Sequence, residues 1–141
     1  MRTIKFRGKR LDNGEWAIGD LEYCRAKNVA RIHTYDAKGY YECQHEVHPD
    51  TVGQFTGVKD KNRKDVYEGD IIECMDSDNQ PIRHFVKYCD EYVGYIQYLP
   101  MGDGPTCKPY NGGLVSQGYI DDMGKYVVGN IHDNPELLKN E

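Results

Sequence analysis

The segment from Gly53 to Ile72, GQFTGVKDKNRKDVYEGDII, alternates short apolar runs with clusters of turn-forming residues. Asp60 and Asn62 can each hydrogen-bond to their own downstream backbone, which favours tight turns. Gly69 supplies the backbone freedom that a chain reversal needs. The segment therefore predicts a short, charged hairpin followed by a β-strand that begins at Gly69-Asp70.

The same alternation of short strands and turns extends along the whole chain of 141 residues. The 12 Tyr, together with Val, Ile and Thr, favour strands, while 15 Gly and 6 Pro favour turns. Long apolar runs with the 3.6-residue period of a helix are absent. A chain of this length can bury a hydrophobic core. These observations predict a mostly β protein.

In the first half of the chain we expect strands at residues 3–8, 15–23, 29–35 and 40–47. Asn13-Gly14 is a strong hairpin signal between the first two strands. Pro49 favours an extended conformation at His48, so we place a domain boundary at His48-Pro49-Asp50. The prediction is a small antiparallel β domain over residues 1–50 and a second domain over residues 51–141.

In the second half we expect strands at residues 70–75, 82–88, 92–99 and 125–132, and a loop at residues 100–113. We leave residues 114–120 unassigned. Asn134 and Pro135 suit the cap and first position of a short C-terminal helix. The residues expected in the core are Phe55, Val66, Ile71, Val86, Ile96, Val128 and Ile131.

Four tyrosines, at positions 88, 92, 95 and 98, have a spacing that a helical stripe would also show. Gly94 lies among them, and its neighbours Val93 and Ile96 are β-branched, which favours a strand. We therefore expect no helix here, and we expect the strand at residues 92–99 to have both faces at least partly covered.

Targeting and redox signals point to a reducing cytosol. No run of 18 apolar residues is present, and the basic N-terminus lacks the apolar segment of a secretory signal. The five cysteines are odd in number, and no two have CxxC spacing, which favours free thiols in a reducing compartment.

Charge is unevenly distributed along the chain, whose net charge is -5. Residues 1–64 hold 13 Lys+Arg and 9 Asp+Glu, whereas residues 65–141 hold 5 and 14. Nucleic-acid binding is one hypothesis, with Trp16 as an aromatic partner that could stack on bases. An acidic total and a pI near 5.5 oppose it. The candidate contacts are Lys5, Arg7 and Lys9 on one face of the first strand, and Lys61 and Arg63 at the hairpin tip.

The leading hypothesis is a non-enzymatic binding or assembly module that recognises a protein partner or a second copy. Tyr is enriched at protein interfaces because it contributes contact area at a low entropy cost. The candidate interface residues, which lie near turns or the Gly/Pro-rich loop, are Tyr40, Tyr41, Tyr110 and Tyr119. The alternative is that most tyrosines line the cores.

A metal site or an enzyme is the least favoured reading. Cys43, His45 and His48 could supply three zinc ligands, but their spacing matches no established zinc pattern and no second ligand pair complements them. No GxGxxG or GxxxxGK[ST] motif and no nucleophile elbow occurs. We therefore assign no catalytic residue and no cofactor.

Three groups of residues occur in order along the chain: Ile4–Arg10 with Gly19-Asp20-Leu21; Thr51–Gly57, Lys59–Asn62 and Tyr67–Ile71; and Val128–Ile131 with Asn134–Leu138. Together they resemble the YopX family of phage and prophage proteins, although the family usually has Gly where this chain has Arg63. The resemblance implies a small N-terminal β domain followed by an SH3-like barrel entered at Gly69-Asp70. It also implies a phage or prophage origin and action in the cytoplasm of the host cell, and suggests a homo-oligomer; the function of the family is not established.

Overall fold

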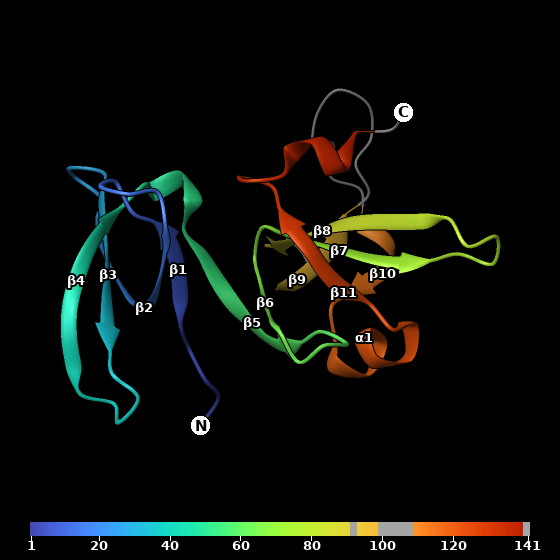
Figure 1. Ribbon diagram of the computed structural model, residues 1–141, viewed down its shortest axis with the longest axis horizontal. Helices are drawn as coiled ribbons and strands as arrows, with labels where there is room; N and C mark the ends of the chain where they lie inside the picture. The colour runs from blue at the N-terminus through green and yellow to red at the C-terminus, as the bar shows by residue number, and fades with distance from the viewer. Residues whose placement is uncertain (91–92, 99–108, 140–141) are drawn as a thin grey trace. The chain divides into compact units, whose positions relative to one another are not determined.

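The computed structural model describes residues 1–90, 93–98 and 109–139, apart from the side chains of residues 109–113. Its contacts divide the chain into two compact units, Met1–Phe55 and Thr56–Glu141. Strands dominate both units (Figure 1). Within the described residues, no helix has the length and apolar character needed to cross a membrane.

The first unit is an antiparallel meander in the order β4-β3-β2-β1 (Figure 1). Each strand is hydrogen-bonded to the next in sequence, as the hairpin signals predict. An isolated bridge between Arg10 and Val47 brings the end of β4 back to the end of β1. The strands are β1 (Phe6–Lys9), β2 (Trp16–Cys24), β3 (Val29–Tyr35) and β4 (Tyr41–Val47).

The core of the first unit is small, and some of its residues have small side chains. Ala17, Ala30, Ile32 and Val47 are buried together. A Cβ atom added to Gly8 would lie 2.7 Å from Val47 Cγ2, so only glycine lets β1 approach β4 this closely.

Strand β5 (Gly53–Lys59) continues from the first unit into the second after the 3₁₀ turn η1 (Pro49–Thr51). Gly53 and Gln54 pair with β1, which keeps the start of β5 in the first unit. The two units therefore divide between Phe55 and Thr56, whereas the expected boundary lay after Asp50.

The second unit contains a five-stranded antiparallel sheet in the order β10-β9-β8-β7-β11. The second unit also contains the hairpin of β5 and β6 (Asp65–Tyr67) and the helix α1 (Gln117–Met123). The prediction of a mostly β fold is confirmed, and no closed barrel is found among the described strands. The sheet strands are β7 (Asp70–Met75), β8 (Pro81–Cys89), β9 (Gly94–Tyr98), β10 (Pro109–Leu114) and β11 (Tyr126–Asn130).

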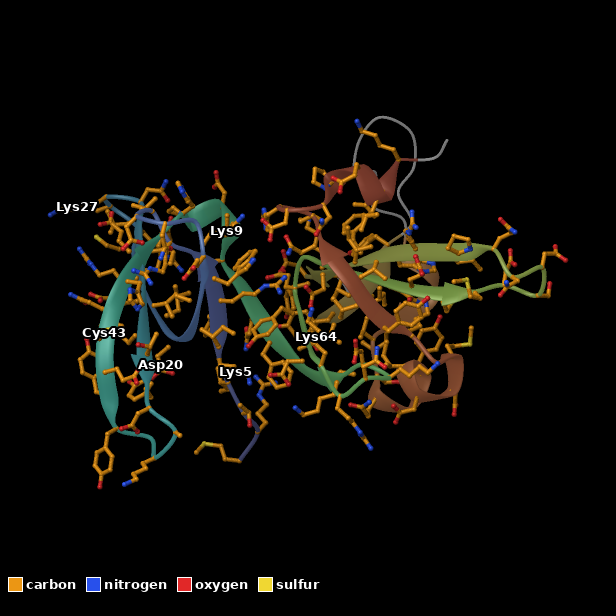
Figure 2. All side chains as sticks on the ribbon, viewed as in Figure 1. Lys5, Lys9, Asp20, Lys27, Cys43 and Lys64 are labelled. Carbon is orange, nitrogen blue, oxygen red and sulfur yellow. The ribbon has the colours of Figure 1, made fainter. Side chains whose placement is uncertain are left out.

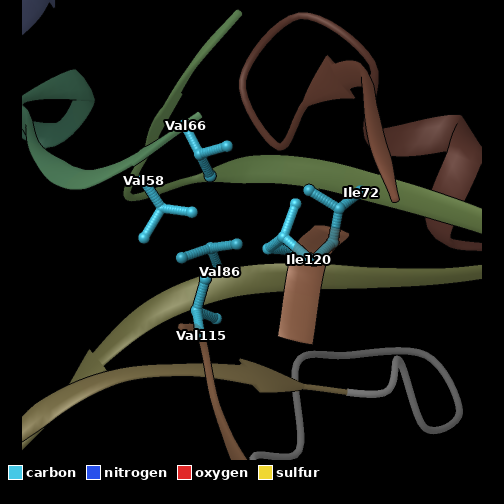
Figure 3. Close-up of a cluster of buried hydrophobic side chains, with 6 residues drawn as sticks. All are labelled: Val58, Val66, Ile72, Val86, Val115 and Ile120. Carbon is cyan, nitrogen blue, oxygen red and sulfur yellow. The ribbon is translucent and has the colours of Figure 1, made fainter. Parts of the chain in front are cut away.

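Both faces of this sheet are covered by apolar side chains. One cluster contains Val58, Val66, Ile72, Val86, Val115 and Ile120 (Figure 3). Another contains Ile71, Phe85, Ile96 and Tyr98. Phe55, Val66, Ile71, Val86 and Ile96 are buried as predicted.

Val128 and Ile131 are only half-buried, although full burial was predicted. Both pack against the cluster around Phe85. Val128 lies on β11, an outermost strand of the sheet, so among the described strands β11 has a neighbour on one side only.

Tyr95 and Tyr98 lie on strand β9, as predicted, whereas Tyr88 lies on β8 and Tyr92 is outside the described residues. Tyr95 packs on the cluster around Ile72, whereas Tyr98 belongs to the cluster on the opposite face. This alternation is the signature of a strand between two covered faces.

Three short elements differ from expectation. Residues 109–113 of the expected loop belong to β10, and residues 100–108 lie outside the described residues. Residues 117–120 of the unassigned segment belong to α1, in which the Ser116 side chain accepts a hydrogen bond from the Tyr119 amide and Gly124 ends the helix with a φ of 62°. The terminal helix is the 3₁₀ turn η2 (Pro135–Leu138). Asn134 stands at its N-cap position, but its side chain accepts a bond from the Asn130 amide instead of capping the turn.

Candidate interaction surfaces

Three hairpin turns share one local structure, in which an aspartate organises the four residues that follow it. Oδ1 of Asp36, Asp60 and Asp76 accepts hydrogen bonds of 2.8–2.9 Å from the amides two and four residues later. This is the turn chemistry that the sequence predicted at Asp60. The residue three positions after each aspartate is left-handed: Gly39, Arg63 and Asn79 have φ values of 88°, 65° and 59°.

The turn between β5 and β6 is anchored more firmly than the other two. Asp60 is 2% exposed, and its second oxygen, Oδ2, accepts a bond of 2.9 Å from the Val127 amide of β11. The Lys61 amide donates to the carbonyl of Lys125 at 2.9 Å. We call residues Lys61–Lys64 at this turn the basic tip.

Helix α1 also holds this hairpin through a pair of reciprocal hydrogen bonds. Gln117 Oε1 accepts from the Lys59 amide at 2.9 Å, and Gln117 Nε2 donates to the Lys59 carbonyl at 2.8 Å. The hairpin is therefore fixed to both α1 and β11 immediately before the basic tip.

The cations of the basic tip point into solvent. Lys61, Arg63 and Lys64 are exposed, and their side chains make no ion pair or hydrogen bond with any described residue. Lys59 differs, because its Nζ pairs with Asp65 at 2.8 Å. Figure 2 labels Lys64 on the hairpin.

Three cations on or directly before β1 lie close to aromatic rings. The guanidinium carbon of Arg7 lies 4.6 Å from the centre of the Trp16 ring, and Lys9 Nζ lies 5.7 Å from it. Lys5 Nζ lies 4.8 Å from the centre of the Phe55 ring. Arg7 is only 8% exposed, so little of its side chain faces solvent, whereas Lys5 and Lys9 are half-buried. Strand pairing explains it, since Trp16 lies directly across from Lys9.

An aromatic cluster lies on the β3–β4 hairpin, and we define it as His33, Tyr35, Tyr40 and Tyr41. Tyr40 and Tyr41 are 71% and 55% exposed. The Tyr41 ring contacts Tyr35 edge-on at 5.9 Å between centroids, and His33 at 5.8 Å. A hydrogen bond to Asp20 raises the pKa of the Tyr35 hydroxyl. The exposed Tyr41 ring is thus in contact with two neighbouring rings before any partner is bound.

The other two tyrosine candidates do not lie in this cluster. Tyr119 is half-buried against the core around Ile72, and its hydroxyl accepts a 2.8 Å bond from Gln97. Part of its ring therefore packs against the interior of the second unit. Tyr110 is part of β10, and its side chain lies outside the described residues.

Two of the candidate metal ligands are neighbours on β4. Cys43 Sγ lies 3.3 Å from His45 Nε2. His48 lies beyond the end of β4, directly before the turn η1. Within the described part of the chain, no group of three or more His, Cys, Asp or Glu side chains is arranged to hold a metal ion.

A buried polar network in the second unit was not predicted from the sequence. Lys125 is 1% exposed, and its Nζ donates to Gln97 Oε1 at 2.9 Å and lies 3.1 Å from His84 Nδ1. The Tyr119 ring lies beneath the same ammonium at 5.3 Å. Burial lowers the pKa of Lys125, and burial together with the nearby lysine lowers the pKa of His84 to about 4. No local sequence signal distinguishes such a lysine from a surface one.

Comparisons with known proteins agree with this fold. The family model described as YopX protein matches residues 5–139. The crystal structure of protein EF1440 from Enterococcus faecalis is similar with a TM-score of 0.55 and 23% sequence identity, over 99% of this chain and 100% of that one. The curated proteins contain no match. At this identity the structural likeness concerns the fold alone.

Proposed function

The chain belongs to the YopX family, and we propose that it is a non-enzymatic binding module that docks a protein partner through the aromatic cluster. The observation that carries the proposal is the exposure of Tyr40 and Tyr41 on one hairpin, where the Tyr41 ring also contacts Tyr35 and His33. Aromatic residues held in this way supply contact area with little further loss of side-chain freedom.

The surroundings of the cluster suit a protein interface. The cluster combines exposed tyrosine rings with a polar contact, because its His33 Nε2 lies 2.8 Å from Glu22 Oε2. An apolar centre with a polar rim is the usual anatomy of a protein–protein interface. We place the module in the cytoplasm of a phage-infected or lysogenic host cell, a setting supported by the family resemblance.

Affinity capture with the tagged full chain tests the proposal. The chain is incubated with host lysate in two arms, with and without nuclease, and bound proteins are identified by mass spectrometry. Tyr40→Ser/Tyr41→Ser is compared with Tyr23→Ser, which removes a 47% exposed tyrosine from the same unit. We expect a nuclease-resistant partner that the double variant loses and the control keeps.

Two results would overturn the proposal. One is a partner that binds the double variant as well as it binds the unaltered chain. The other is a partner that disappears with nuclease, since capture would then depend on nucleic acid. A second copy of the chain as the captured partner would make the module self-assembling, and light scattering of the purified chain detects this case.

A further inference from the structure

Arg63 occupies a backbone conformation that its side chain does not favour. In the equivalent position of the other two aspartate turns the chain has Gly39 and Asn79, the residue types that adopt the left-handed region most readily. Nothing in the described residues compensates Arg63, because its side chain makes no hydrogen bond or ion pair there. A strained residue with an unengaged charge is a mark of function.

The basic tip is rigid as well as charged. Asp60 bonds the amides of Asn62, Lys64 and Val127, and Gln117 holds Lys59 from the other side. The backbone that carries the cations is thus fixed before a ligand arrives, which lowers the entropy cost of binding.

The tip is a local concentration of positive charge in an acidic unit. Residues 56–141 contain 9 Lys+Arg and 15 Asp+Glu, and four of those nine cations fall within residues 59–64. The hairpin therefore presents a sign of charge opposite to that of the rest of its unit, which suits an anionic ligand.

The composition of the hairpin around the basic tip indicates which class of anionic ligand it binds. Residues 59–64, KDKNRK, contain no apolar or aromatic side chain. A protein interface needs an apolar centre, and single-stranded nucleic acid is held by aromatic rings on which its bases stack. Contacts to the phosphates of a duplex need only positioned cations and polar groups.

We propose that Lys61, Arg63 and Lys64 bind the phosphate backbone of a nucleic-acid duplex without regard to base sequence. The contact lies in the second unit, independent of the aromatic cluster in the first. It differs from the Lys5, Arg7 and Lys9 candidates, whose cations lie close to aromatic rings. Asn62, exposed between Lys61 and Arg63, can add a hydrogen bond to a phosphate or sugar oxygen.

The test measures fluorescence anisotropy of a labelled mixed-sequence duplex of about 20 base pairs with the purified full chain. Three phosphate contacts predict a slope of about -2.7 when log K is plotted against log salt between about 50 and 200 mM. Lys61→Glu/Arg63→Glu/Lys64→Glu should weaken binding by about tenfold or more. The control is Arg25→Glu/Lys27→Glu/Lys38→Glu, which makes the same change in net charge at exposed turns of the first unit. This control should weaken duplex binding by less than about threefold.

Arg63→Gly separates binding from folding. It should raise the melting temperature, because glycine relieves the left-handed strain, and still reduce the salt slope by about one. Equal losses in the two triple variants, a flat salt dependence, or unchanged affinity in Arg63→Gly would each overturn the proposal. These results leave the capture experiment on the aromatic cluster unaffected, so the two proposals can fail separately.

Discussion

Lys125 Nζ lies 3.1 Å from Nδ1 of His84 inside the second unit, where both residues are at most 2% exposed. An ammonium group only donates hydrogen bonds, so Nδ1 is the acceptor and the imidazole carries its proton on Nε2. Burial and the neighbouring lysine lower the pKa of His84 to about 4, which keeps the ring neutral at pH 7. A neutral histidine in this position couples the stability of the unit to pH.

Stability should fall as the solution is acidified from pH 7 to pH 5. The unfolded chain protonates His84 near its ordinary pKa of 6.5, whereas the folded chain resists protonation until about pH 4. The unfolded state therefore binds more protons in this window, and the free energy of unfolding should decrease by about 2 kcal/mol for this residue. Urea unfolding at the two pH values measures the change.

His84→Asn is the matched control for this effect. The amide oxygen of asparagine can take the place of Nδ1 as acceptor for Lys125, but the amide does not titrate. The variant should lose less stability on acidification than the unaltered chain. Identical pH profiles for the two proteins would show that another group causes the acid sensitivity.

Arg63→Gly should stabilise the chain by about 1 kcal/mol, since a left-handed residue with a Cβ atom is disfavoured by about that amount. Lys64→Gly is the control, because Lys64 lies in the same exposed turn without a positive φ. That change should be neutral or destabilising. Denaturant midpoints of both variants measure the difference, and destabilisation by Arg63→Gly would show that Arg63 carries no strain.

Asp60→Ala should destabilise the second unit by about 3 kcal/mol, because three backbone amides lose their acceptor and one of them belongs to β11. Asp76→Ala removes the same two turn bonds from an exposed hairpin. There the Asp76 carboxylate accepts no third hydrogen bond from any described residue. This change should cost about 1 kcal/mol. Chemical unfolding compares the two, and equal losses would mean that the bond to β11 contributes nothing.

Local chemistry explains which parts of the fold could be predicted. The aspartate and glycine turns fix where strands end, so the strand order of the first unit and the start of β7 at Asp70 follow from neighbouring residues. Asp70 is 1% exposed and accepts a 2.7 Å bond from the Tyr67 amide, a contact of only three residues in sequence.

Contacts between residues distant in sequence explain which structural features could not be predicted from the sequence. Lys125 is buried because its partners Gln97 and His84, 28 and 41 residues away, reach it from other strands. The alternation of β1 placed its cations on one face, but only the pairing with β2 covers Arg7 with Trp16. Helix α1 has only seven residues, too few for an apolar period to appear.

The glycine of the Val128–Ile131 segment has a specific structural task, which leads to the last prediction. A Cβ atom at Gly129 would collide with the side chain of Asn134, whose Oδ1 accepts a 3.3 Å bond from the Asn130 amide. The collision involves a side chain held by that bond, so its rotation away from the new methyl group would cost the hydrogen bond.

Gly129→Ala should therefore destabilise the chain by about 2 kcal/mol, and Asn134→Ala by about 1 kcal/mol through the lost acceptor. In the double variant the second change removes the obstacle met by the new methyl group. Its loss should then be smaller than the sum of the two single losses, which a double-mutant cycle of urea unfolding measures. Additive losses would show that Gly129 is needed for some reason other than the approach of Asn134 to β11.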